Sequence, residues 1–199
     1  MGTVEYSARE ATKAASGCSC QFGAAPYHPR PVITVPAPVI ADMQTHAFAG
    51  YPGEAVGLLF AARGSQTASR FVPLENIQDK LHALDPAEHP RTSRNGFQVN
   101  GRAMQKHLEA AVEKGEALLA LCHSHIDCGA YFSVEDQDMA APPPEHRPNE
   151  PELWHIVMAC WKDGMREANA FRWNGRGFAG HSLPGFALAY RLPSESLKA

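Results

Sequence analysis

The feature that most constrains the fold is a run of six apolar residues, ALLALC (117–122), that leads directly into His-Ser-His (123–125). A continuous apolar run of this length is typical of a β-strand that is covered on both faces. A second short apolar segment, EAVGLLFAA (54–62), also reads as a buried strand. Together with the helices described next, these strands predict an α/β domain with a mixed central β-sheet flanked by helices.

Two segments have the apolar spacing of helices. Residues 39–50 carry apolar side chains at i, i+3 and i+7, which predicts a helix with one buried face. A longer helix is predicted to start after Asn100, a suitable N-cap, and to end at Gly115 as its C′ residue. The apolar stripe of this helix is formed by Met104, Leu108, Ala111 and Val112.

The rest of the chain divides into short strands and polar connections. Proline-rich and polar stretches at 78–95 and 142–152 are predicted to be surface loops. Further strands are predicted at 69–76, 96–100, 153–160, 168–173 and, as an edge strand, 186–192. The domain organisation that we expect is a flexible N-terminal tail (1–31), a folded domain (32–180) and a C-terminal extension (181–199).

Charge and cysteine content restrict the classes of partner and compartment. The formal net charge of −3 gives no reason to expect a nucleic-acid partner, and no stretch is apolar and long enough to suggest a membrane span. The N-terminus lacks the apolar run of a secretory signal, so a cytoplasmic protein is expected. The five cysteines are odd in number and irregularly spaced, which argues against a disulfide framework, and Cys18 and Cys20 are interpreted as a reduced, idle pair.

The segment after the apolar run carries the chemistry. Side chains alternate along a strand, so His123 and His125 point to the same side and can reach one ion, while Ser124 points to the other. A short helix is predicted to start at Ser133, which places Asp136 in its first turn. Two imidazoles and one carboxylate form the three-ligand set of a catalytic zinc, whose fourth position is left for water.

A purely structural interpretation also exists for part of this segment. Ser133 and Asp136 form the S-x-x-D pattern of a helix N-terminal cap, which explains both residues without any metal. The complete pattern H-S-H-x7-S-x2-D, however, resembles the signature of the JAMM, or MPN-plus, metallopeptidases. The positions that match this signature are His123, Ser124, His125, Ser133 and Asp136.

An upstream glutamate extends the resemblance. JAMM proteins have a glutamate before an apolar strand, and the segment YPGEAVGLLF (51–60) places Glu54 there. The resemblance implies a cytidine-deaminase-like α/β fold of JAMM/MPN type, with the small prokaryotic members as the most similar in size. One departure is Ile126, which stands where the family usually has proline after the second histidine.

The resemblance also implies a function. The expected activity is zinc-dependent hydrolysis of the bond after the C-terminal glycine of a ubiquitin or ubiquitin-like protein of the sulfur-carrier type. His123, His125 and Asp136 would hold Zn²⁺, Glu54 would be the general base, and Ser133 would donate to the oxyanion. The loops at 78–95 and 142–151 are candidates for contacting the substrate's globular body. The alternative is a non-catalytic MPN-fold module that binds a ubiquitin-like partner, and the oligomeric state stays open.

Overall fold

The computed structural model describes residues 32–186, 189 and 190. The expectations for the tail at 1–31, for Cys18 and Cys20, and for most of the C-terminal extension lie outside these residues.

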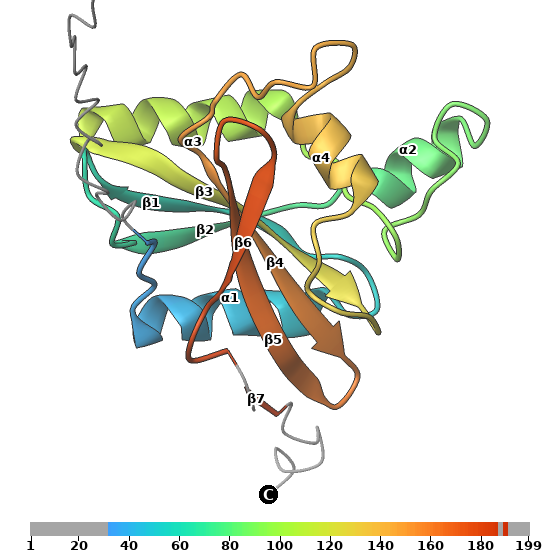
Figure 1. The fold of residues 1–199 in the computed structure, drawn as a ribbon. Coiled ribbons are helices and arrows are strands. Elements are labelled where there is room, and N and C mark those ends of the chain that lie inside the picture. The colour runs from blue at the N-terminus through green and yellow to red at the C-terminus, as the bar shows by residue number, and fades with distance from the viewer. Residues whose placement is uncertain (1–31, 187–188, 191–199) are drawn as a thin grey trace, which may run out of the picture. The chain divides into compact units, whose positions relative to one another are not determined.

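The described strands form one mixed sheet in the order β2-β1-β3-β4-β5-β6, and β7 also pairs with β5 (Figure 1). Strands β3 and β4 are parallel, whereas the other neighbours are antiparallel. The predicted mixed central sheet is thereby confirmed. The strand bounds are β1 (Val56–Ala62), β2 (Arg70–Leu74), β3 (Glu116–Ile126), β4 (Trp154–Trp161), β5 (Gly164–Trp173), β6 (Phe178–Ser182) and β7 (Ala189–Tyr190).

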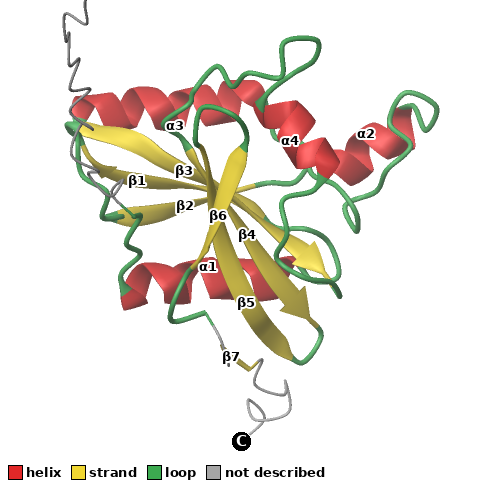
Figure 2. Cartoon of the chain, viewed as in Figure 1, coloured by secondary structure: helices red, strands yellow, loops and turns green. Residues whose placement is uncertain are grey.

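Helices lie on both faces of this sheet (Figure 2). Helix α1 packs on one face of the sheet through its fully buried residue Met43. Helix α3 packs on the other face through Ala111. The central strands β1, β3 and β4 are buried along most of their length, as expected for strands covered on both sides. The helix bounds are α1 (Ala37–Gly50), α2 (Gln78–Leu84), α3 (Gly101–Glu113) and α4 (Val134–Ala140).

The predicted ends of α3 are confirmed. The side chain of Asn100 accepts hydrogen bonds from two backbone N–H groups of the first turn. Gly115 follows the helix with φ of 69°, a left-handed conformation that glycine adopts without a steric penalty. The apolar stripe was predicted one residue too wide, because Val112 is 57% exposed and points away from the sheet.

The structure differs from the sequence predictions at three places. Residues 96–100 are extended but belong to no strand, because side-chain and backbone groups of Asn76 and Ile77 take the place of a pairing strand. The predicted loop at 78–95 begins with the short helix α2. Strand β6 lies at Phe178–Ser182, which the sequence pattern missed, so the sheet continues past residue 180.

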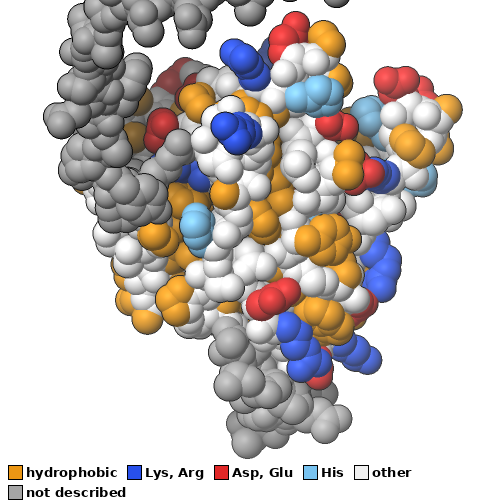
Figure 3. Space-filling model, viewed as in Figure 1, with side chains coloured by type: hydrophobic (Ala, Val, Ile, Leu, Met, Phe, Trp, Pro, Cys, Tyr) orange, Lys and Arg blue, Asp and Glu red, His pale blue; other side chains and the backbone are white. Residues whose placement is uncertain are grey.

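Two surface properties follow from the described residues. None of their helices is long and apolar enough to cross a membrane. On the face shown in Figure 3, acidic and basic side chains are interspersed rather than gathered by sign, in keeping with the small net charge of the chain.

Candidate metal centre

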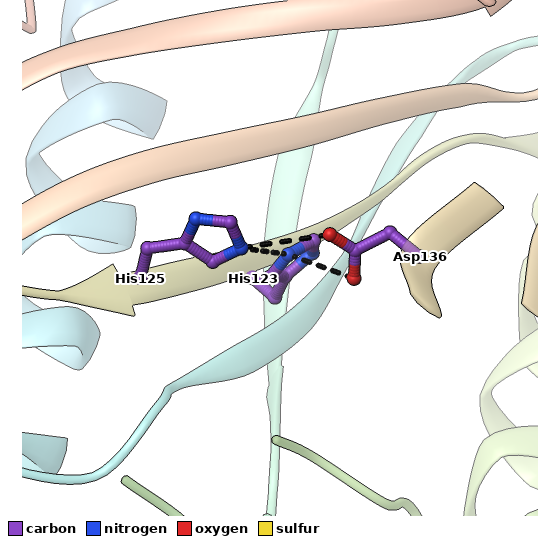
Figure 4. A group of neighbouring side chains, drawn as sticks. All are labelled: His123, His125 and Asp136. Carbon is purple, nitrogen blue, oxygen red and sulfur yellow. Dashed lines mark hydrogen bonds and ion pairs between the residues drawn. The ribbon is translucent and has the colours of Figure 1, made fainter. Parts of the chain in front are cut away.

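Strand β3 and helix α4 bring together three side chains that could hold a metal ion (Figure 4). His123 and His125 point to the same side of β3, as their spacing predicts, and Asp136 enters from the first turn of α4. The histidine Nε2 atoms are 3.2 Å apart. Asp136 Oδ1 lies 3.3 Å from Nε2 of His123, and Oδ2 lies 3.5 Å from Nε2 of His125.

These distances match those between the ligands of a single small ion. Atoms bound at 2.0–2.1 Å to one tetrahedral zinc are about 3.3–3.4 Å apart, which is close to the separations of 3.2, 3.3 and 3.5 Å found here. All three side chains are buried. Cys122 points to the opposite face of the sheet, where it joins the core, so no thiolate competes from that position. The donor set therefore fits a metal ion held by two nitrogens and a carboxylate.

The electrostatics of the triad keep its ligands ready for a cation. Burial alone would raise the pKa of Asp136, but hydrogen bonds from His123 and His125 hold it well below its usual range. Burial lowers the pKa of His123. It acts in the same direction on His125, where the hydrogen bond to Asp136, the charge of Glu54 and the carbonyl of Gly129 outweigh it, so this pKa is raised.

Ser133 forms a complete capping box with Asp136. Its hydroxyl donates to Asp136 Oδ2 over 2.7 Å and accepts from the Asp136 backbone N–H over 3.1 Å. Its own backbone N–H donates to the same carboxylate oxygen over 2.9 Å. The cap interpretation is confirmed, and it coexists with the ligand geometry, because the cap fixes the orientation of the carboxylate. The role of Ser133 toward an oxyanion stays a prediction.

Glu54 lies between α1 and β1 and is only 9% exposed. Its backbone is fixed on both sides: the N–H donates to the Ser93 carbonyl over 2.6 Å, and the carbonyl accepts from the Asn76 amide over 2.9 Å. Burial raises the pKa of Glu54 to about 7; His125 opposes this shift and Asp136 adds to it. The carboxyl therefore changes protonation near neutral pH, as a general base requires.

Ser124 connects the two parts of the site. It is fully buried on the face of β3 away from the histidines, and its hydroxyl accepts from the Ala55 N–H over 2.9 Å. Its own N–H donates to the Ala55 carbonyl over 2.9 Å. The residue between the histidines thus holds the residue after Glu54, which fixes the glutamate relative to the ligands. This arrangement agrees with an orienting role rather than a nucleophilic one.

His123 lines an adjoining pocket that shares Asp136 and Phe97 with the main cleft. His125, Asp136 and Glu54 open into this main cleft, which has a volume of about 510 Å³. Its walls include residues that the sequence analysis did not single out. The ring of Phe97 lies 4.8 Å from that of His123, and the ring of Tyr131 lies 4.8 Å from that of His125. Two ion pairs join the segment before Phe97 to residues that follow β3: Arg91–Glu135 and Arg94–Asp127. No local motif marks these residues, which meet only through the fold.

Solved structures similar to this chain include the following three proteins. Protein DSY2949 from Desulfitobacterium hafniense is 20% identical, with a TM-score of 0.56 over 76% of this chain and 91% of that one. A protein from Salinibacter ruber is 16% identical, with a TM-score of 0.51 over 80% and 95%. AF2198, a JAB1/MPN domain protein from Archaeoglobus fulgidus, is 12% identical, with a TM-score of 0.44 over 77% and 96%. No match was found among curated proteins.

The family of this chain is identified by the sequence profile of prokaryotic homologues of the JAB domain, which matches residues 36–174. This range runs from the start of α1 to the end of β5 and contains the three ligands, Glu54 and Ser133. The match confirms the resemblance to small prokaryotic JAMM/MPN proteins and the α/β fold of that type. The chain belongs to the family of prokaryotic homologues of the JAB domain.

Proposed function

We propose that the protein is a zinc-dependent peptidase or isopeptidase that hydrolyses the bond after the C-terminal glycine of a ubiquitin-like protein. The observation that carries this proposal is the His-His-Asp set of side chains beside the buried carboxyl of Glu54, with His125, Asp136 and Glu54 open to one cleft. In the metal-free protein this carboxyl has a pKa of about 7 because it is buried, and buried carboxyls with a raised pKa are concentrated at functional sites.

Each residue then has a chemical role. When bound by His123, His125 and Asp136, zinc supplies a Lewis acid that acidifies water and polarises the scissile carbonyl. Glu54 accepts the proton of the attacking water and delivers it to the leaving amine. The hydroxyl of Ser133, which lines the cleft, is the donor that we assign to the developing oxyanion, and this role requires its proton to turn away from Asp136 Oδ2.

The extended segment 96–99 gives the substrate's tail a place to dock. On one side of this segment, Gly96 and Gln98 are hydrogen bonded to residues 76 and 77. On the other side, no hydrogen bond from a described residue occupies the N–H or carbonyl of Phe97 or Val99. These free groups resemble the edge of a sheet, to which an extended peptide can add as a further strand.

The position of this edge favours a tail that ends at the metal. Residues 96–98 line the same cleft as His125 and Asp136, and Phe97 contacts His123. Small residues at the end of the tail would be needed next to the buried ligands, because the rings of Phe97 and Tyr131 flank the histidines. A Gly-Gly terminus of a ubiquitin-like protein meets both requirements.

The test is hydrolysis of a ubiquitin-like protein that carries a short peptide fused after its terminal Gly-Gly, followed by mass spectrometry. We expect the zinc-loaded protein to release the peptide after the second glycine. The matched control is Glu54→Gln, which preserves size and should bind zinc while losing at least about a hundredfold in kcat. A second substrate with Val-Val in place of Gly-Gly should be cleaved much more slowly.

Two results would count against the proposal. A zinc-loaded wild-type protein that binds the fusion without cleaving it would identify the non-catalytic binding module instead. A Glu54→Gln variant as active as wild type would show that the glutamate takes no part in proton transfer.

A further inference from the structure

The ligand His125 has a hydrogen-bond partner behind it, on the side away from the other ligands. Its Nε2 faces His123 and Asp136, while its Nδ1–H donates to the carbonyl of Gly129 over 3.1 Å. Metal-binding histidines commonly donate their second N–H to a carboxylate, a carbonyl or water, which fixes the ring and raises the basicity of the ligating nitrogen. Here the acceptor is a backbone carbonyl in the loop between β3 and α4.

The same peptide group makes a second hydrogen bond at its other end. The N–H of Ala130, which belongs to the peptide unit of the Gly129 carbonyl, donates to Oε1 of Glu167 over 3.0 Å. An unbroken chain therefore runs from the Glu167 carboxylate through this peptide group to the imidazole of His125. The next carbonyl, that of Ala130, accepts from the side-chain amide of Asn169 over 2.8 Å.

The sheet register explains why β5 can reach the loop. His125 pairs with Ala159 on β4, and Ala159 pairs with Glu167 on β5, so these three residues form one row across the sheet. The middle position is a buried alanine, whose small side chain leaves room for the loop to lie on the sheet. Ala130 is 1% exposed in that space. Its backbone groups must therefore find partners within the protein, and β5 supplies them.

We propose that Glu167 is a positioning residue for the metal ligand His125, acting through the Gly129–Ala130 peptide group. A carboxylate that accepts from the peptide N–H polarises the peptide and makes its carbonyl a stronger acceptor. The stronger acceptor holds the Nδ1–H of His125 and leaves Nε2 free as a better metal ligand. The arrangement is a carboxylate–histidine pair with one peptide group between its members. The inference rests on the proposed zinc site but not on any peptidase activity.

A comparison of Glu167 with Asn169 distinguishes this positioning role from simple support of the loop. Both residues hold Ala130, but only the Glu167 bond lies on the peptide unit that contacts His125. Loss of loop support alone would act equally through either residue. Polarisation depends on the negative charge of Glu167, so the substitution Glu167→Gln, which keeps an acceptor oxygen and removes the charge, isolates it.

The experiment measures zinc affinity by competition with a chromophoric chelator, together with the melting temperature of the metal-free protein. We expect Glu167→Ala to weaken zinc binding about tenfold to a hundredfold, the range for outer partners of metal ligands. Glu167→Gln should weaken it a few-fold, because Glu167 is exposed and water screens its charge. The matched control is Asp163→Asn, which removes an exposed carboxylate from the same β4–β5 hairpin and should leave zinc affinity unchanged.

A nuclear magnetic resonance measurement reports directly on the hydrogen-bond chain from Glu167 to His125. In protein labelled with ¹⁵N at histidine, the Nδ1 signal of zinc-loaded His125 should shift in Glu167→Gln and stay in place in Asp163→Asn. Wild-type zinc affinity in Glu167→Ala, or an unmoved His125 signal in Glu167→Gln, would overturn the inference. Weakened affinity in both Glu167→Ala and Asn169→Ala to the same degree, with equal loss of melting temperature, would reduce Glu167 to loop support. Failure of the wild type to bind zinc would instead refute the proposed metal site.

Discussion

The raised pKa of Glu54 has a consequence for stability that can be measured without substrate or metal. Burial raises the pKa of this carboxyl from 4.5 to about 7 in the folded protein. A group whose folded-state pKa is raised contributes stability below its unfolded pKa, and this contribution is lost as pH rises through the folded value. Ionisation of Glu54 should therefore lower the free energy of unfolding of the metal-free protein as the pH rises from 5 to 8. Glu54→Gln, which cannot ionise, should not show this decrease.

The size of the effect follows from the shift. One unit of pKa corresponds to about 1.36 kcal/mol, so a rise from 4.5 to about 7 corresponds to about 3 kcal/mol over the full titration. The window from pH 5 to pH 8 covers most of it, about 2 to 3 kcal/mol. The charge of Glu54 also raises the pKa of His125, so the difference between the variants includes the interaction of these two groups.

Urea unfolding of the metal-free wild type and Glu54→Gln at pH 5 and pH 8 provides the measurement. The free energy of unfolding of wild type should fall relative to Glu54→Gln by about 2 to 3 kcal/mol between these limits. Zinc should abolish most of the difference, because a divalent cation beside the carboxyl favours its ionised form. Equal pH dependence in the two metal-free proteins would refute the reasoning that Glu54 is buried and uncharged at low pH.

Two further substitutions test the cap and the core separately. Ser133→Ala should cost about 1 kcal/mol of unfolding free energy by removing the cap and should also weaken zinc binding in chelator competition, because Asp136 loses its orienting hydroxyl. Ser133→Thr should restore both, and a variant that loses stability but keeps full zinc affinity would contradict the coupling. Met43→Ala should cost about 2–5 kcal/mol in urea unfolding, since Met43 is fully buried on the inner side of α1, on the sheet face opposite the ligands. Its zinc affinity should stay at the wild-type level, and a marked loss would show that the two faces are coupled.

The parts of the site that the sequence predicts are those set by local geometry. The period of two along a strand places His123 and His125 on one side of β3 whatever the rest of the fold does. The S-x-x-D spacing places Asp136 over the cap of α4 in the same way. Glu54 is different, because its distance from the ligands depends on the pairing of β1 with β3, and only the family resemblance indicated its place.

The parts that were missed depend on contacts between distant segments. Residues 96–100 have the composition of a strand, but their hydrogen bonds go to Asn76 and Ile77, and no local pattern shows that a side chain takes the place of a strand. Strand β6 contains Ala, Gly and Ser, which give no apolar alternation, and its place is set by pairing with β5. Glu167 looks like an ordinary exposed residue on a hairpin until the sheet register brings it to Ala130.

The capping box resolves the competition between the structural and the chemical interpretations of Ser133 and Asp136. A carboxylate has two oxygens, and here they have different partners: Oδ2 receives the N–H and O–H of Ser133 and lies 3.5 Å from His125 Nε2, while Oδ1 lies 3.3 Å from His123 Nε2. The helix cap therefore does not use up the ligand. It holds one oxygen in place and thereby fixes the direction of the other, which reduces the entropy lost when a metal binds. On this view a helix start was a suitable place for the third ligand because helix formation itself orients the carboxylate.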